Sequence, residues 1–165
     1  MIREMTRDTA RTWAEISLGN LEHNYRDLRA CAPESRFLGT VKANAYGHGA
    51  VPVARRLVEL GTDYLAVACL EEAAELRKAG IAAPILILGY TPPELAAEAV
   101  DLDITQGVFT PELAKALSEA AGAAGKRAKI HLKADTGMSR LGVLDHDPEA
   151  AAKELARPCA LPHLE

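Results

Sequence analysis

FLGTVKANAYGHGAVPVARRLVEL, residues 37–60, is the clearest strand, loop and helix pattern in the chain. It begins with a short apolar run, passes through a loop with two glycines, and ends in a helical stretch that stops at Gly61. Apolar runs of the same kind recur at Tyr64–Ala68, Ile85–Leu88, Ile104–Phe109 and Ala128–Ala134. Helical stretches of about ten residues separate most of these runs, and the alternation favours parallel βα units.

Helix boundaries are also well marked. Apolar residues recur at steps of three and four over about Leu18–Ala32, which predicts an amphipathic helix there. Three later helices are predicted to start where a capping residue precedes proline, because the cap accepts a backbone N–H and proline has none to lose: Thr91–Pro92, Thr110–Pro111 and Asp147–Pro148. Glycine is predicted to end helices at Gly61, Gly80 and Gly122.

Five βα-type strands in series fit either an open doubly wound α/β sheet or part of a TIM-type (β/α)8 barrel. A complete barrel needs about 250 residues. A chain of 165 residues therefore supplies about five βα units and leaves two strand edges without partners. At roughly 150 residues per domain, residues 1–165 form one domain.

The composition is that of a soluble globular protein, with 48% hydrophobic residues, 25% charged residues and a formal net charge of −4. The chain has no basic run, so neither nucleic acid nor an anionic membrane is an expected partner. Its three cysteines stand far apart, which argues against a disulfide framework or a metal site. Met1–Arg11 lacks the apolar core of a secretory signal, and the expected compartment is the cytoplasm.

Two lysines stand at the carboxyl ends of predicted strands, where parallel α/β folds bind ligands. Strand periodicity places Lys42 on one face with Thr40, and Lys133 on a polar face with His131. The glycines after Lys42 let the backbone approach a bound group, and the next helix start offers N–H groups that suit a phosphate. A partly desolvated lysine favours its neutral amine, which can form a Schiff base with an aldehyde. The plainer reading is a solvated lysine after a strand.

The string VKANAYGHG at Val41–Gly49 resembles the pyridoxal-phosphate-lysine motif of the alanine racemase family. AEI at Ala14–Ile16 and HLKADTGMSRLG at His131–Gly142 resemble two further stretches of that family, in the same order. The resemblance spans about Thr12–Gly142. It implies the N-terminal portion of a TIM-type barrel of fold-type III, with pyridoxal 5'-phosphate as cofactor.

Carried over position by position, the resemblance implies that Lys42 binds the cofactor covalently and acts as one of two acid–base groups. Tyr46 would contact the cofactor phosphate. Arg140 would reach the phenolic oxygen of the cofactor and help to hold the substrate carboxylate. Lys133 would match the lysine that is carbamylated in many members and that orients this arginine. Ser139 stands where those members have glycine, a departure that we expect to be tolerated.

The implied activity is that of an isomerase that interconverts L-alanine and D-alanine for peptidoglycan precursor supply. The chain ends at Glu165, before the later barrel strands and the C-terminal β domain of the family. We therefore expect an incomplete barrel domain that does not racemise amino acids at a normal rate alone. The full-length member is expected to be a homodimer. An alternative is a non-catalytic pyridoxal-phosphate-binding barrel, similar to the single-domain homeostasis proteins.

Other polar side chains have plainer interpretations. His131 is interpreted as part of a filled barrel interior or as a support for Lys133. His48 is interpreted as fixing the cofactor loop, and His163 is given no role. The glutamates at residues 71, 72 and 75 read as a solvated helix face.

Overall fold

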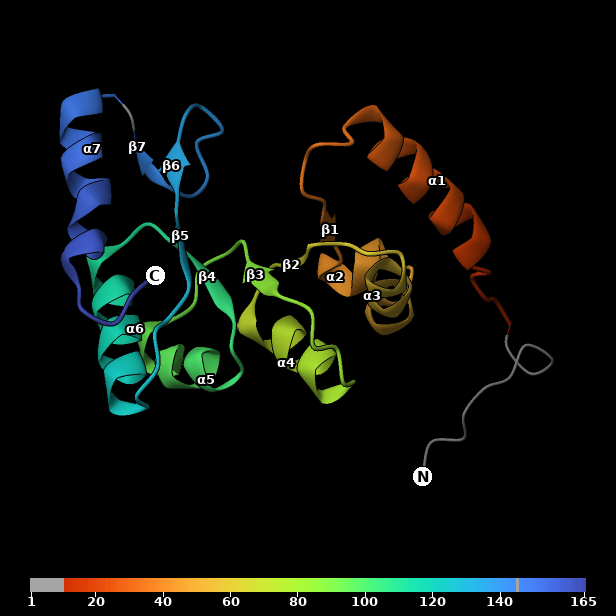
Figure 1. Cartoon of the computed structure of the whole chain (residues 1–165), viewed down its shortest axis with the longest axis horizontal. Coiled ribbons are helices and arrows are strands. Elements are labelled where there is room, and N and C mark those ends of the chain that lie inside the picture. The colour runs from red at the N-terminus through yellow and green to blue at the C-terminus, as the bar shows by residue number, and fades with distance from the viewer. Residues whose placement is uncertain (1–10, 145) are drawn as a thin grey trace.

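The computed structural model describes residues 11–144 and 146–165. Its main feature is a five-stranded parallel sheet in the order β1-β2-β3-β4-β5 (Figure 1). The five strands are β1 (Leu38–Thr40), β2 (Tyr64–Val67), β3 (Ile85–Ile87), β4 (Thr105–Val108) and β5 (Ile130–Leu132). A separate two-stranded pair follows, formed by β6 (Ala134–Asp135) and β7 (Val143–Leu144).

Helices join and flank these strands. They are α1 (Leu18–Cys31), α2 (Lys42–Tyr46), α3 (Ala50–Glu59), α4 (Leu70–Lys78), α5 (Ala96–Asp101), α6 (Pro111–Ala123) and α7 (Pro148–Ala156), with 3-10 turns at η1 (Pro93–Leu95) and η2 (Arg157–Ala160). Figure 1 shows α3, α4, α5 and α6 along one side of the sheet, with α1 and α7 at its two ends. In the described parts of the chain, no helix is both long and apolar enough to cross a membrane.

The strand order decides between the two predicted architectures. In a doubly wound sheet the order reverses at a switch point. Here each strand pairs in parallel with the next one in the sequence, so every crossover steps in the same direction, as in a barrel. Leu164 forms a further parallel bridge with Ala128, so pairing continues outside β5. The fold is therefore part of a (β/α)8 barrel, and the doubly wound alternative is wrong.

The hydrophobic core lies between the sheet and the helices. Leu65 of β2 and Ile85 and Ile87 of β3 have no exposed surface, and all three belong to one cluster with apolar side chains of α3 to α6. Burial of such side chains contributes about 1.5–3 kcal/mol each. Alternate residues of the strands face the other way, toward the barrel interior.

Polar groups occupy that interior side. The hydroxyl of Tyr64 on β2 lies 2.8 Å from that of Thr105 on β4, and the Tyr64 ring centroid lies 6.2 Å from that of His131 on β5. Ile130 packs against the hydrophobic core instead. Ile130 and His131 thus lie on opposite faces as predicted, although His131 is exposed and Leu132, predicted to pack on the helices, is 38% exposed.

Most predicted helix boundaries are confirmed. The first helix ends at Cys31, one residue before the predicted limit. The Thr110 hydroxyl accepts the Leu113 N–H, and the Asp147 carboxylate accepts two N–H groups at the start of α7. Gly61 and Gly80 both have positive φ just after a helix.

Two boundary predictions are wrong. Gly122 lies inside α6, which ends a residue later, and Gly125 has the positive φ. Position 122 requires glycine because of packing, since a Cβ there would lie 2.6 Å from the ring of His163. Thr91 does not cap a helix. It is buried, and its hydroxyl donates to the side-chain oxygen of Gln106 at 2.6 Å.

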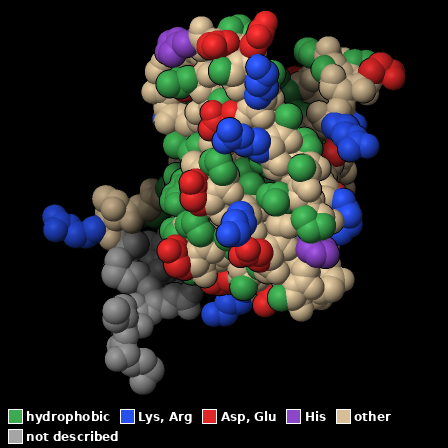
Figure 2. Space-filling model, turned by 90° about the vertical axis from the view of Figure 1, so that its left-hand side faces the viewer, with side chains coloured by type: hydrophobic (Ala, Val, Ile, Leu, Met, Phe, Trp, Pro, Cys, Tyr) green, Lys and Arg blue, Asp and Glu red, His purple; other side chains and the backbone are tan. Residues whose placement is uncertain are grey.

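The surface carries charges of both signs. On the face shown in Figure 2, where α6 and α7 lie, Lys and Arg side chains alternate with Asp and Glu side chains. Such a mixed face lacks the continuous positive potential that attracts nucleic acid.

Candidate active site at the carboxyl ends of the strands

The predicted site residues lie in the segments that follow the barrel strands. Lys42 comes two residues after β1, and its side chain is half-buried. Its Nζ lies 6.0 Å from the ring centroid of Tyr46, so the structure brings these two residues together. The Tyr46 side chain is 61% exposed, which leaves its hydroxyl free to meet a ligand.

The backbone between these two residues is left-handed. Ala43, Asn44, Ala45 and Tyr46 all have φ between 51° and 54°, and Gly47 follows with φ 88°. For residues other than glycine, this conformation costs about 1–2 kcal/mol each. Four such residues in succession store several kcal/mol of strain, which persists only where the surroundings hold it in place. Segments of this kind concentrate at functional sites.

Hydrogen bonds from nearby side chains stabilise the strained turn. The Asn44 side-chain oxygen accepts the Ala50 N–H at 2.7 Å, and the His48 ring nitrogen Nδ1 lies 2.9 Å from the Ala45 carbonyl oxygen. His48 thus contacts the turn, in line with its interpretation as a residue that fixes the loop. A third contact comes from outside the motif, because Glu72 on α4 accepts the Ala43 N–H at 2.7 Å.

Glu72 corrects the reading of residues 71–75 as a solvated face. Its side chain is half-buried, and its second carboxylate oxygen accepts the N–H of Ala68 at the end of β2. The sequence signal was present but weak. Glu72 is the third residue of α4, where a glutamate commonly turns back to a backbone N–H near the helix start.

The start of α3 offers fewer free N–H groups than predicted. Ala50 donates to Asn44, and Pro52 has no N–H. Only Val51 among the first three residues of the helix keeps an N–H for a ligand. A phosphate near this loop would therefore depend more on the Tyr46 hydroxyl than on the helix start.

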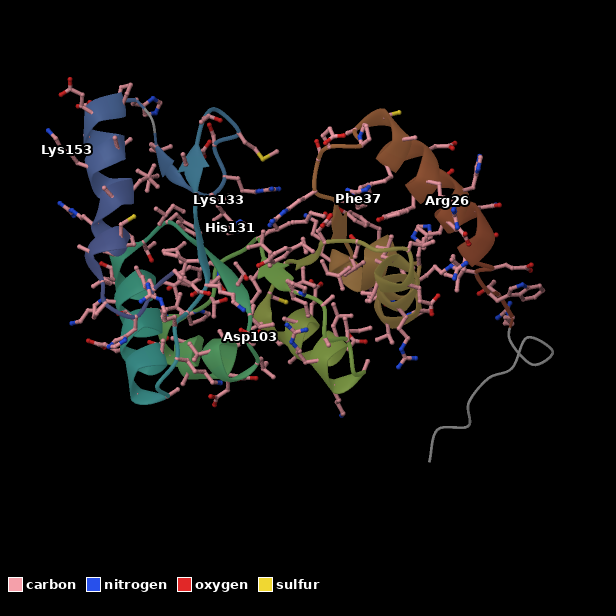
Figure 3. All side chains as sticks on the ribbon, viewed as in Figure 1. Arg26, Phe37, Asp103, His131, Lys133 and Lys153 are labelled. Carbon is pink, nitrogen blue, oxygen red and sulfur yellow. The ribbon has the colours of Figure 1, made fainter. Side chains whose placement is uncertain are left out.

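Lys133 lies at the other edge of the sheet. It follows β5 directly (Figure 3), whereas Lys42 comes two residues after β1. Both residues therefore stand at the carboxyl ends of parallel strands. The Lys133 Nζ donates to the carbonyl oxygen of Leu88, beyond β3, at 3.1 Å. The side chain of Arg140 is exposed.

Asp135 shapes the loop that carries Arg140. Its buried carboxylate accepts the backbone N–H groups of Gly137, Ser139 and Arg140 at 2.9–3.1 Å. The hydrogen bond from the Ser139 N–H, followed by that from Gly137, holds the pKa of Asp135 below its usual value of 3.8. The family motif pointed to the lysine and the arginine of this stretch, while the aspartate that folds the loop between them was missed as a functional residue.

Asp135→Asn is expected to loosen this loop in a pH-dependent manner. An amide has one acceptor oxygen, so the Arg140 N–H would face an NH2 group. A carboxyl whose pKa is lowered on folding stabilises the fold fully above its unfolded value, near 3.8, and loses that contribution as the pH falls through the folded pKa. The wild type should therefore have the higher unfolding midpoint at pH 7, and the difference from the variant should shrink as the pH falls below about 3.8. A constant difference between pH 7 and pH 2.5 would contradict this account.

Ser139→Gly is expected to stabilise the protein slightly. Ser139 has φ 58°, and glycine adopts this conformation without strain. The relief of about 1 kcal/mol is partly offset by the greater freedom of glycine in the unfolded chain. Urea unfolding should give an equal or higher midpoint for Ser139→Gly. Ser139→Ala keeps the strain and serves as the control, and the account fails if the alanine variant is the more stable of the two.

No group of three or more His, Cys, Asp or Glu side chains suited to a metal ion occurs in residues 11–144 and 146–165. The reactive groups at the carboxyl ends of the strands are instead a primary amine, a phenol, a second amine and an exposed guanidinium. The molecule is therefore part of a parallel α/β barrel with a half-buried lysine after its first strand.

Comparison with known proteins identifies the family. The sequence profile of the alanine racemase N-terminal domain matches residues 16–165. "Alanine racemase 2" of Caldanaerobacter subterraneus subsp. tengcongensis is 53% identical over 137 residues, which is 82% of this chain and 35% of that protein. The chain thus spans about a third of the length of this relative. It belongs to the alanine racemase family, within the N-terminal domain.

Solved structures agree with this assignment. Alanine racemase from Clostridium difficile 630 in complex with cycloserine superposes with a TM-score of 0.89 at 40% identity, covering 95% of this chain and 43% of that one. Histidine racemase from Leuconostoc mesenteroides subsp. sake gives a TM-score of 0.76 at 31% identity, covering 89% and 39%. The fold is therefore that of fold-type III enzymes, and proteins named for different amino acids share it.

Proposed function

We propose that this chain is the cofactor-binding barrel portion of a pyridoxal 5'-phosphate-dependent alanine racemase. The observation that carries the proposal is the Lys42 amine, held half-buried after β1 by a left-handed turn and placed 6.0 Å from the Tyr46 ring. Family membership supports it. Because relatives are much longer, we propose that further barrel strands and a β domain complete the site in the whole protein.

The residues present fit the cofactor. An aldehyde and a phosphate require an amine nucleophile and hydrogen-bond donors, and Lys42 and Tyr46 supply one of each at the same loop. The backbone at Gly47 leaves room, since a Cβ there would meet no atom within 4 Å. Bound there, pyridoxal phosphate supplies an electron sink that makes the α-hydrogen of an amino acid acidic.

The side chains of this chain would then do the following. Lys42 holds the cofactor and moves a proton at its Nζ on one face of the substrate. Tyr46 donates its phenol hydrogen to the phosphate. Arg140 donates to the phenolic oxygen of the cofactor and to the substrate carboxylate, a task suited to its fixed charge. Lys133, when carbamylated, becomes an anion that orients Arg140.

The whole protein is proposed to act on alanine in the cytoplasm, as a homodimer, and to supply D-alanine for the cell wall. L-alanine and D-alanine differ only at the α-carbon, so the activity can be followed through that hydrogen. Incubation of the whole gene product with L-alanine and pyridoxal phosphate in D2O should give D-alanine with deuterium at the α-carbon. Cofactor binding without exchange or racemisation would favour the carrier alternative over the racemase.

A further inference from the structure

Glu72 links two segments that meet at the mouth of the barrel. It lies in the first turn of α4, and its carboxylate accepts the Ala43 N–H through Oε1 and the Ala68 N–H through Oε2, both at 2.7 Å. Ala68 follows β2, and Ala43 is the residue directly after Lys42. One side chain therefore joins the loop of Lys42 to the neighbouring strand.

The two hydrogen bonds of the Glu72 carboxylate connect different parts of the chain. The bond to Ala68 returns to the residues just before α4, as in many helix starts. The bond to Ala43 leaves this helix and reaches another βα unit, 29 residues earlier in the sequence. Its acceptor is charged, and bonds to charged acceptors are about twice as strong as neutral ones.

Ala43 is the first residue of the strained turn. Its φ is 51°, whereas that of Val41, two residues earlier, is −120°. The backbone changes handedness between them, next to Lys42. A donor fixed at this point limits the rotation of the peptide that follows Lys42, and thus limits the direction of its side chain.

We propose that Glu72 is a positioning residue for Lys42, a role that rests on the proposed function of that lysine. Its carboxylate fixes the Ala43 peptide, so the amine is already directed toward the site before the cofactor arrives. The preorganisation strengthens cofactor capture without contact between Glu72 and the cofactor.

The test compares Glu72→Gln with Glu75→Gln in the whole gene product. Glutamine keeps the size of Glu72 but has only one acceptor oxygen. Glu75 is exposed, one turn along the same helix, and is the matched control. The dissociation constant of pyridoxal phosphate is measured from the visible absorbance of the Lys42 adduct, in buffer without urea, where each variant is folded. The pH at which this absorbance is half-maximal is measured as well. Amide exchange of Ala43 is measured without cofactor.

Glu72→Gln should weaken cofactor binding about tenfold, shift the pH midpoint and speed up exchange of the Ala43 amide by a similar factor. Glu75→Gln should match wild type. If Glu72→Gln fails to fold, Glu72→Asp, which keeps the charge but has a shorter reach, should give an intermediate loss. Equal affinity and pH midpoint in wild type and Glu72 variants would overturn the positioning role alone. Absence of a Lys42-dependent absorbance in wild type would overturn the proposed function, and the positioning role with it.

Discussion

Lys42→Ala should abolish covalent capture of pyridoxal phosphate. The wild-type protein, mixed with the cofactor, should develop a visible absorbance that borohydride reduction makes permanent, with the label on the peptide that contains Lys42. The variant should show only free cofactor, because alanine has no nucleophile and the Tyr46 phenol cannot replace the amine. The expected loss is complete rather than partial, since the remaining groups would bind the cofactor only reversibly.

Lys133→Ala is the matched control for this experiment. Lys133 also stands at the carboxyl end of a barrel strand, on the other edge of the sheet. Its amine donates to the Leu88 carbonyl, so it is occupied within the fold. Because Lys133 is proposed to orient Arg140 and not to bond to the cofactor, Lys133→Ala should keep the absorbance of the Lys42 adduct. If the absorbance is lost in Lys133→Ala and retained in Lys42→Ala, the nucleophile is Lys133 and not Lys42, and the proposed site is refuted.

The barrel strands and their faces could be predicted because they depend on local chemistry. Apolar runs of four to seven residues, bounded by helical stretches, correspond to all five strands of the sheet within a residue or two. The alternation of Ile130 and His131 followed directly from the period of a strand. The strand order could not be predicted, because it depends on how successive units pack against each other.

The left-handed turn after Lys42 could not have been predicted. Alanine and asparagine favour a right-handed helix or an ordinary turn, and the strain of Ala43 to Tyr46 is offset by contacts from side chains of the motif and from Glu72 on α4. The same holds for Gly122, whose small size serves His163, 41 residues away in sequence, and not the end of its own helix. In both cases a contact with a residue distant in the sequence contributes, Glu72 for the turn and His163 for Gly122.

The family motifs pointed to Lys42, Tyr46, Lys133 and Arg140, which carry reactive groups. They did not point to Glu72 and Asp135, whose carboxylates bind backbone N–H groups of the two loops. A contact between a carboxylate and the backbone leaves only a weak signature in the sequence, because many arrangements place a carboxylate near an N–H. Each of the two segments that follow β1 and β5 thus carries two reactive side chains, and one acid shapes its backbone.

The second large effect is expected on the free energy of unfolding, from substitution of Arg77. Its guanidinium, on α4, donates to four carbonyl oxygens at 2.6–3.0 Å, namely those of Ile81, Ala83, Leu102 and Asp103. These carbonyls belong to the segments that lead into β3 and β4. Burial lowers the pKa of Arg77, although the group stays charged, and the nearby Asp103 carboxylate opposes that shift.

Arg77→Met should destabilise the protein by roughly 3 kcal/mol, because it leaves four carbonyls without their donor while it keeps the apolar stem. In urea the midpoint should fall by more than about 1 M. Arg77→Lys should lie between wild type and Arg77→Met, since an ammonium has three donors and no planar fork. Lys78→Met, at the exposed neighbouring position, is the control. Equal midpoints for Arg77→Met and Lys78→Met would mean that water satisfies these carbonyls as well as the guanidinium does, and that the approach to β3 and β4 is held by apolar packing alone.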